Sequence, residues 1–254
     1  MKLGDFSDLA KAYSQSRPSY SEKVLSSILG FLDIPLNRLE IADVGAGTGI
    51  WSRMLNKRTN QEVLSVEPNL EMLNQGILDS KELAINWVQG SAESIPAVNS
   101  SKNWVTMASS FHWADFDTAI SEFRRVLKPG GYFTALWNPR YYEANPKLLE
   151  IEKWLNKTIT TPRISSGRSG ITDNLTSKLE SMNQIEDVIY IEGKHHQIIS
   201  RDMYVTAWRS TNDVQVKLGP RKFEEFISYI QEVFEKDEPI QTTYLTRAWT
   251  AKFK

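Results

Sequence analysis

A glycine-rich turn directly after a short buried strand constrains this chain more than any other feature. Residues 41–44 are apolar apart from Asp43, and glycines stand at positions 45, 47 and 49, before a segment with a helical pattern that begins at Ile50. Glycine adopts positive φ angles and lets a ligand approach the backbone where a Cβ would clash. The run therefore predicts a strand that turns sharply into a helix and holds a ligand against bare backbone.

The spacing of these glycines indicates the kind of ligand. A dinucleotide-binding turn has the pattern G-x-G-x-x-G, whereas here Ile50 occupies the place of the third glycine. The Asp43 carboxylate would repel a pyrophosphate but can accept hydrogen bonds from an ammonium group. The turn therefore favours a cationic nucleoside without phosphates over the NAD of an oxidoreductase.

Strands alternate with helices over the first 137 residues, which predicts an α/β fold with a doubly wound, mostly parallel Rossmann-like sheet. We expect strands at residues 41–44, 62–67, 85–88, 104–108 and 132–137, with helices at 20–34, 50–57, around 72–73 and at 117–127. A turn is expected at residues 128–131, because a Pro-Gly-Gly run follows the last of these helices.

The pattern changes after residue 138. Further helices are expected at 148–155, 203–209 and 223–234, strands at 188–192 and 243–253, and a loop at 160–172. No linker-like boundary separates this half, so residues 1–254 are expected to form one domain. Residues 138–183 and 200–237 are expected to be helical insertions that cap the carboxyl edge of the sheet and bind substrate.

Composition excludes several classes of protein. The 254 residues include 30 basic and 31 acidic side chains, so no overall charge recruits nucleic acid. With no cysteine and three histidines, two of them adjacent at His195 and His196, no metal site is expected. No apolar stretch has the length of a signal peptide or a membrane span, so we expect a cytoplasmic protein with no membrane partner. The oligomeric state is not indicated.

Taken together, the motifs resemble those of the class I S-adenosylmethionine-dependent methyltransferases. The chain looks most like a small-molecule branch of methyltransferase type 11 that shares a Phe-His-Trp segment and includes trans-aconitate methyltransferase-like enzymes. The resemblance rests on the order of motifs along nearly the whole chain, at residues 13–20, 43–49, 66–68, 90–93, 111–113, 125–131 and 244–247. It implies S-adenosylmethionine as cofactor, S-adenosylhomocysteine as product, no metal, and a lid segment at residues 1–20.

The resemblance also implies a set of cofactor-binding residues. Glu67 ends the second strand at about the separation expected of an acid that binds the ribose hydroxyls, although a surface acid is the alternative. Residues 91–93 belong at the adenine, unless Glu93 is a solvated loop acid. The expected set is Asp43, Gly45, Ala46, Gly47, Thr48, Gly49, Glu67, Pro68, Met72, Ser91, Ala92, Glu93, Ser109, Phe111, Tyr13 and Arg17.

His112 follows the fourth strand, toward which the resemblance directs the reactive methyl group, and is the candidate catalytic residue. An imidazole is a natural general base for an O–H or N–H nucleophile. The family keeps this segment across different substrates, which favours a wall or an orienting group, and a packed structural histidine is a further alternative. The expected substrate-binding residues are Tyr20, His112, Trp113, Trp137, Asn138, Tyr141, Trp208 and Arg209.

The expected function is methyl transfer to an oxygen or nitrogen nucleophile of a small molecule. The alternatives are a carboxyl O-methyltransferase of a small organic acid, a non-catalytic protein that keeps the fold, and a methyltransferase of proteins. A carboxylate acceptor would be supported if arginines converged on the site, the candidates being Arg17, Arg140, Arg163, Arg168 and Arg209. Converging aromatic residues would support a flat heterocycle.

Overall fold

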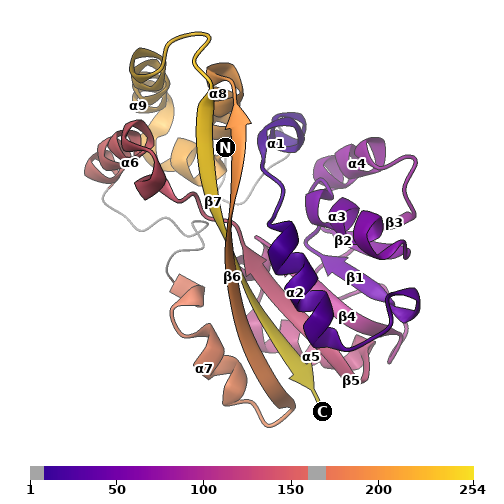
Figure 1. The fold of residues 1–254 in the computed structure, drawn as a ribbon. Helices are drawn as coiled ribbons and strands as arrows, with labels where there is room; N and C mark the ends of the chain where they lie inside the picture. The colour runs from indigo at the N-terminus through magenta and orange to yellow at the C-terminus, as the bar shows by residue number, and fades with distance from the viewer. Residues whose placement is uncertain (1–8, 160–169) are drawn as a thin grey trace.

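The computed structural model describes residues 9–159 and 170–254. At its centre lies a seven-stranded sheet with the order β3-β2-β1-β4-β5-β7-β6 (Figure 1). The first five strands are parallel, and β7 is antiparallel to both β5 and β6. The strands are β1 (Ile41–Val44), β2 (Val63–Glu67), β3 (Ile85–Gln89), β4 (Lys102–Ala108), β5 (Leu127–Trp137), β6 (Ile185–Ile199) and β7 (Ile240–Phe253). The predicted α/β fold with a mostly parallel sheet is confirmed.

Helices cover both faces of this sheet because its strands are apolar on both sides. In β1, Ile41 packs in a cluster with α2 (Glu22–Leu32) and α3 (Ile50–Thr59). The next residue, Ala42, points to the other face and packs in a cluster with α5 (Phe116–Val126). α4 (Leu70–Asp79) lies beside β3, where the Trp87 ring fills the space next to Gly76. Strand order reverses between β1 and β4, the position where ligands bind in doubly wound sheets.

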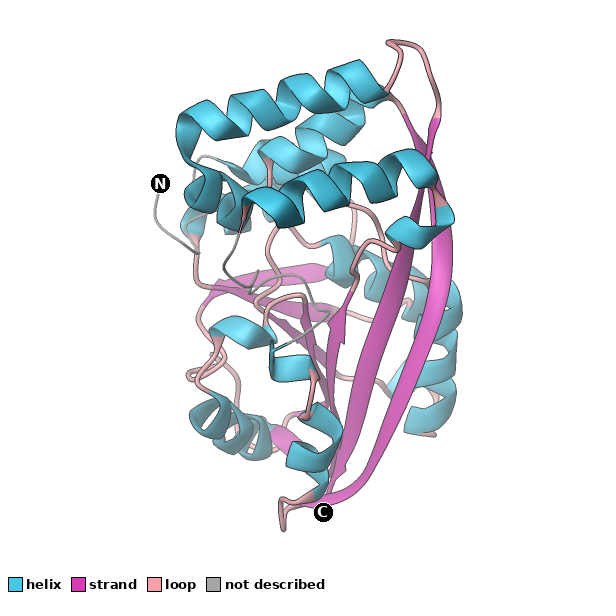
Figure 2. Ribbon diagram, turned by 90° about the vertical axis from the view of Figure 1, so that its left-hand side faces the viewer, coloured by secondary structure: helices cyan, strands magenta, loops and turns pink. Residues whose placement is uncertain are grey.

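A third layer of helices stands beyond the ends of the strands (Figure 2). α6 (Pro146–Thr158), α8 (Arg201–Arg209) and α9 (Asn212–Val233) pack around Trp208 and Phe226 in a cluster of their own. The expected insertion at residues 138–183 is divided between two parts of the fold. Its first helix, α6, belongs to this cluster, whereas α7 (Leu175–Glu180) buries Leu175 and Leu179 in the core of the sheet. We call α6, α8 and α9 the helical layer. Its role as a substrate cap stays a prediction.

Several bounds differ from those expected. The turn expected at 128–131 lies inside β5, where Gly130 has a φ of 75° and the pairing with β4 is irregular. α9 begins eleven residues before the expected 223, and bends at Gly219, whose φ is 70°, just before Pro220. A short helix, α1 (Ala10–Ser16), lies within the expected lid segment. Most of the loop expected at 160–172, including Arg163 and Arg168, lies outside the described residues.

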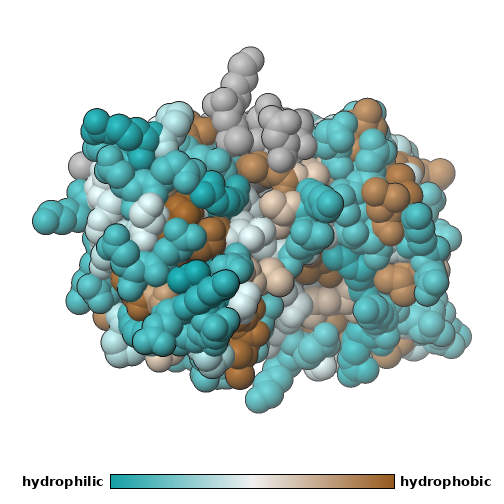
Figure 3. Space-filling model, turned by 90° about the horizontal axis from the view of Figure 1, so that it is seen from above, coloured by the Kyte–Doolittle hydropathy of each residue, from teal (hydrophilic) through white to brown (hydrophobic). Residues whose placement is uncertain are grey.

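Within residues 9–159 and 170–254, no helix combines the length and the apolar character that crossing a bilayer requires. Hydrophilic residues predominate in the view from above, and hydrophobic ones lie in scattered patches (Figure 3). The cytoplasmic location stays a prediction.

Candidate active site

The glycine turn after β1 has the geometry that its sequence predicts. Gly45, Gly47 and Gly49 all have positive φ angles, of 66°, 59° and 77°. A Cβ at Gly45 would lie 2.7 Å from the Ser110 side chain, so the strand end leaves no room for a larger residue. The N–H groups of Gly45 and Ala46 donate to the carbonyl of Val66, which ties the turn to β2. The ends of β1 and β2 are thereby held at one edge of the sheet.

A cavity of about 270 Å³ opens between this turn and the ends of β2 and β4. We call it the loop cavity. It brings together residues expected from four separate motifs, namely Tyr13, Gly45, Ala46, Gly47, Thr48, Glu67, Pro68, Met72, Ser91, Ala92, Glu93 and Ser109.

Glu67 is an acidic residue on the wall of the loop cavity. Its side chain is buried, with 6% of the residue exposed, which excludes a surface acid. One carboxylate oxygen accepts from the Gly47 N–H at 2.7 Å and the other from the Asn69 N–H at 2.9 Å. Burial raises the pKa of Glu67, and these two hydrogen bonds oppose the rise. Each oxygen has further lone pairs with which to accept from a pair of hydroxyls.

Asp43 does not line the loop cavity, contrary to expectation. It is 0% exposed, and its carboxylate accepts from the hydroxyls of Ser52 and Thr106 at 2.5 and 3.1 Å. Burial raises the pKa of Asp43 to about 7, although these hydrogen bonds oppose the rise. Successive side chains of a strand point to opposite faces, so Asp43 faces α3 rather than the edge where a ligand would sit. It is a buried group that joins β1, α3 and β4.

Two more expected cofactor residues lie elsewhere. Phe111 is fully buried and packs against Phe116 and Phe133 in the core, so it cannot reach the cavity. Gly49 is the N-cap of α3, and a Cβ there would lie 2.7 Å from the Trp87 ring. The positive φ of Gly49 and the close approach of the Trp87 ring on β3 both favour glycine at this position.

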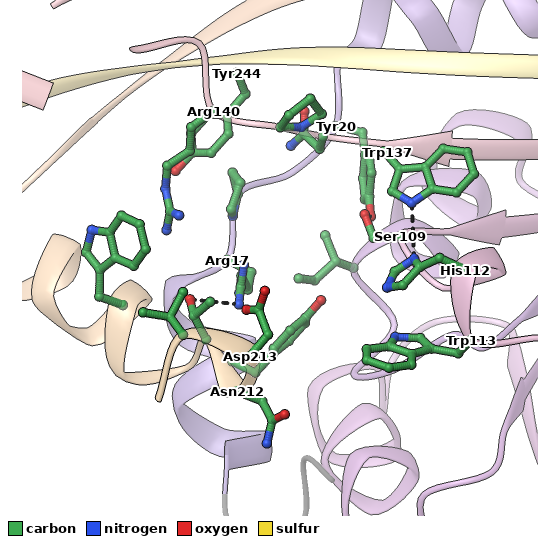
Figure 4. Close-up of a pocket in the computed structure, with 18 of the residues that line it drawn as sticks. Arg17, Tyr20, Ser109, His112, Trp113, Trp137, Arg140, Asn212, Asp213 and Tyr244 are labelled. Carbon is green, nitrogen blue, oxygen red and sulfur yellow. Dashed lines mark hydrogen bonds between the residues drawn. The ribbon is translucent and has the colours of Figure 1, made fainter. Parts of the chain in front are cut away.

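A second cavity, of about 140 Å³, lies between the ends of β4 and β5 and the start of α9 (Figure 4). We call it the cap cavity. Tyr13, Tyr20, Ile50, Ser109 and Trp113 line both cavities, so the two adjoin. Of the expected substrate-binding residues, the cap cavity contains Tyr20, His112, Trp113, Trp137, Asn138 and Trp208.

Ser109 stands where the two cavities meet. It is a non-glycine residue in the left-handed region, with a φ of 56°, and such strain collects at functional sites. The Tyr20 hydroxyl donates to the Ser109 hydroxyl at 2.9 Å. The Ser109 N–H donates to the carbonyl of Leu136, which secures the loop after β4 to β5.

His112 lies on the wall of the cap cavity next to Trp137. The indole N–H of Trp137 donates to His112 Nδ1 at 3.2 Å. The other ring nitrogen, Nε2, is buried without a hydrogen-bond partner among the described residues, and Figure 4 shows it directed toward the cavity. Burial lowers the pKa of His112 to about 4, although the electrostatic interaction with Asp213 acts to raise it. The ring is therefore neutral at pH 7.

Arg17, expected among the cofactor-binding residues, lines the cap cavity and not the loop cavity. Its guanidinium donates to the Ser210 carbonyl at 3.1 Å and to the hydroxyls of Ser210 and Thr211 at 3.2 Å. Burial lowers the pKa of Arg17, and Arg140 adds to this effect while Asp213 opposes it. Arg140 lines the same cavity, 4.2 Å from the ring centre of Trp208. Two guanidinium groups thus converge there.

Two expected substrate-binding residues do not reach the cap cavity. Arg209 is exposed on α8 and pairs with Glu224 at 2.7 Å. Tyr141 lies under the ammonium group of Lys194, 3.7 Å from the ring centre. Each is adjacent in sequence to a residue that lines the cavity, but neither lines it itself.

Sequence reasoning missed the contribution of α9. Asn212 and Asp213 line the cap cavity from its first turn. A Thr-Asn-Asp run before apolar residues is a typical helix start and was the available signal. No group of three or more potential metal ligands occurs in the part of the chain that the structure describes.

Comparisons with known proteins agree with this geometry. Residues 41–131 match the family model of a methyltransferase domain. An uncharacterised methyltransferase of Mycobacterium bovis is 35% identical over 135 residues, which are 53% of this chain and 52% of the relative. The chain thus spans about half the length of the curated relatives that it matches first.

Solved structures extend the likeness to the rest of the chain. A provisionally named type II methyltransferase from Anaeromyxobacter dehalogenans has a TM-score of 0.64 at 16% identity, covering 93% of this chain and 97% of the other. The chain has the class I methyltransferase fold. A phosphoethanolamine N-methyltransferase of Haemonchus contortus, solved with S-adenosylhomocysteine, shares this methyltransferase fold with a TM-score of 0.56 at 12% identity, over 97% of this chain and 57% of the other.

Proposed function

We propose that this protein is an S-adenosylmethionine-dependent methyltransferase that methylates an oxygen or nitrogen nucleophile of a small molecule. One observation carries the proposal: the loop cavity, with Glu67 on its wall, adjoins the cap cavity at Ser109. A bound nucleoside and a bound acceptor would therefore meet at the carboxyl edge of the sheet, as doubly wound folds require.

The residues of the loop cavity fit S-adenosylmethionine. The Glu67 carboxylate suits the two ribose hydroxyls, and Met72, Ala92 and Met107 offer apolar surface for a purine ring. The Thr48 hydroxyl oxygen is buried without a hydrogen-bond partner among the described residues, so a donor or acceptor on a ligand would satisfy it. At the turn, the glycines with positive φ have no side chains, so a ligand can approach the backbone closely.

When bound, S-adenosylmethionine supplies an activated methyl group, so the protein has to align the acceptor and exclude water. Alignment of this kind contributes on the order of 7–11 kcal/mol in favourable cases. Tyr20, Ser109 and Trp113 border the junction of the cavities and would hold the acceptor there. The end of α8 and the start of α9 line the far side of the cap cavity and would exclude water there.

For the acceptor, the structure favours a carboxylate, in line with the resemblance to the trans-aconitate-like branch. Arg17 and Arg140 both line the cap cavity, and guanidinium groups suit planar anions. Aromatic walls at Trp113, Trp137 and Trp208 would accommodate a flat acid. Carboxyl O-methylation of a small organic acid is therefore the acceptor class that we propose to test first.

Calorimetric titration with S-adenosylmethionine and S-adenosylhomocysteine, with NADH as control, tests the cofactor. We expect micromolar binding of the sulfur nucleosides and about a tenfold or greater loss in Glu67→Gln, since a charge-assisted hydrogen bond contributes ~1.5–3 kcal/mol. Glu71→Gln, an exposed acid in the first turn of α4, is the matched control and should bind normally. Failure of the sulfur nucleosides to bind, or binding of NADH instead, would refute the proposal.

Transfer of a labelled methyl group to a panel of small organic acids then tests the activity. Binding of the cofactor without transfer to any acid, amine or phenol would favour the non-catalytic alternative.

A further inference from the structure

The hydrogen bond between Trp137 and His112 determines where the histidine carries its proton. An indole N–H can only donate, so His112 Nδ1 must accept, at the observed 3.2 Å. A neutral imidazole has one N–H, and the other nitrogen must then bear it. His112 is consequently the Nε2–H tautomer at neutral pH.

This Nε2–H group lacks a partner in the part of the chain that the structure describes. It is buried, and it points into the cap cavity in Figure 4. Buried donors in native proteins are almost always paired, so an unpaired donor on a cavity wall indicates a partner that arrives with a ligand. The missing partner is an atom with an available lone pair.

We propose that His112 is a hydrogen-bond donor that binds an oxygen of the methyl acceptor through Nε2–H, and that it is not the general base. A base needs an available lone pair, but that of Nδ1 is engaged by Trp137 and Nε2 already bears hydrogen. This inference rests on the proposed function, because it assigns a role at the same site.

The donor role specifies the class of acceptor. An alcohol or an ammonium group has to lose a proton before or during methylation, whereas a carboxylate is already ionised at pH 7. When a carboxylate oxygen attacks the methyl carbon, an O–C bond forms and the C–S bond breaks with its electron pair going to sulfur. No proton moves, so a site without a histidine base suffices. Asp213 borders the same cavity, but it interacts with Arg17.

The tautomer can be measured without any enzymatic activity. Long-range ¹H–¹⁵N correlation spectra of the uniformly labelled protein at pH 7 distinguish Nδ1–H, Nε2–H and charged histidines. Only three histidines contribute, and His112→Gln identifies the signals of His112. We expect Nε2–H in the natural protein and a mixture of tautomers in Trp137→Phe. A Nδ1–H or a charged His112 in the natural protein would overturn the inference, whether or not the cofactor binds.

A ligand probe tests the carboxylate part. Benzoate, a flat carboxylate, is titrated into the protein with S-adenosylhomocysteine present, and the His112 Nε2 signal is followed. We expect a saturable shift that is absent with benzyl alcohol. An unmoved Nε2 signal at saturating benzoate would contradict an oxygen partner for this donor.

Two variants separate a donor from a base once an acid substrate is known. Glutamine can donate an N–H but cannot take up a proton, whereas phenylalanine can do neither. We expect His112→Gln to keep kcat/KM within about tenfold and His112→Phe to raise KM for the acid by about tenfold to a hundredfold. Both should bind S-adenosylhomocysteine normally, which distinguishes failure of this inference from failure of the proposed function. Equal loss of kcat in both variants would show that His112 is the base.

Discussion

Asp43 shows how a single residue can belong to a sequence motif and yet lie outside the cavity that the motif borders. The acid lies two residues before the first glycine, and its position and its ability to accept hydrogen bonds from an ammonium group suggested that it binds the cofactor. Its side chain instead leaves β1 on the face that α3 covers, where it accepts hydrogen bonds from Ser52 and Thr106. Its contribution is to hold three elements in register behind the turn.

This burial makes the stability of the fold depend on pH. The pKa of Asp43 is about 7 in the folded protein and about 3.8 in an unfolded chain, so the folded state retains a proton that the unfolded state releases. The contribution of this group to the free energy of unfolding is therefore highest below pH 4 and falls as the pH rises toward 7, by at most ~1.4 kcal/mol per pH unit.

Asp43→Asn should remove that dependence while keeping hydrogen bonds to both hydroxyls. We expect the difference in unfolding free energy, variant minus natural protein, to shift in favour of the variant by about 1–3 kcal/mol between pH 5 and pH 8. Urea unfolding at the two pH values measures this difference. Glu67 also contributes to the pH dependence of stability, but it is present in both proteins, so its contribution cancels in the difference. A difference that does not change with pH would show that Asp43 is not protonated in the folded state.

The sequence predicted single residues well where chemistry and backbone geometry coincide. Gly45, Gly47 and Glu67 lie where their spacing indicated, because a tight turn and a strand end leave little choice of position. Arg17 and Phe111 do not, since motif order says nothing about which way a side chain leaves a short helix or loop. Long-range packing, with Ser210 in one case and Phe133 in the other, decides those directions.

At the scale of elements, the bend in α9 is the clearest departure from simple patterning. Gly219 has a φ of 70° and ψ of 166°, and Pro220 starts the next helical turn. The Gly-Pro pair reads as a boundary, so the sequence predicted only the second part of the helix. The first part matters for the site, because Asn212 and Asp213 border the cap cavity.

A pair of glycine substitutions tests this bend. No heavy atom lies within 4 Å of a Cβ built at Gly219 or at Gly30, so backbone conformation alone decides the outcome at each. We expect Gly219→Ala to lower the unfolding free energy by ~1–2 kcal/mol, because its φ is positive. Gly30→Ala, inside α2, should raise it by ~0.5–1 kcal/mol. Urea denaturation measures both, and equal effects would mean that the bend is not maintained in solution.

Strand lengths were the least predictable quantity. β6 runs from Ile185 to Ile199, but only 188–192 shows a strand pattern. Its alternation of polar residues around His195 and His196 hides the signal, because one side of this edge strand faces water. β7, which pairs with a strand on each side and is mostly buried, was predicted nearly to its ends.

At the scale of the whole molecule, β7 links the sheet's cores to the helical layer. Ile240, at its start, packs in the cluster of α6, α8 and α9, while Phe253, at its end, packs with α5 and α7. Ala248, between them, contacts the cluster of α2 and α3. One continuous strand thus belongs to all three clusters and joins the helical layer to the sheet.

We therefore expect the two parts to unfold together. With 5-fluorotryptophan incorporated, ¹⁹F NMR resolves Trp208 in the helical layer and Trp104 in the sheet, assigned by Trp→Phe variants. Their unfolding curves in urea should coincide, as two-state behaviour requires. A Trp208 curve that transitions at lower urea would show that the helical layer opens on its own.

Trp113 gives the molecule a built-in optical reporter. It is 41% exposed and borders both cavities, whereas Trp51 borders only the loop cavity and Trp137 and Trp208 border only the cap cavity. Indole emission responds to the polarity and mobility of its surroundings, so a ligand in either cavity would change the same signal. The order in which two ligands arrive could then be followed in real time by stopped-flow fluorescence on the unlabelled protein.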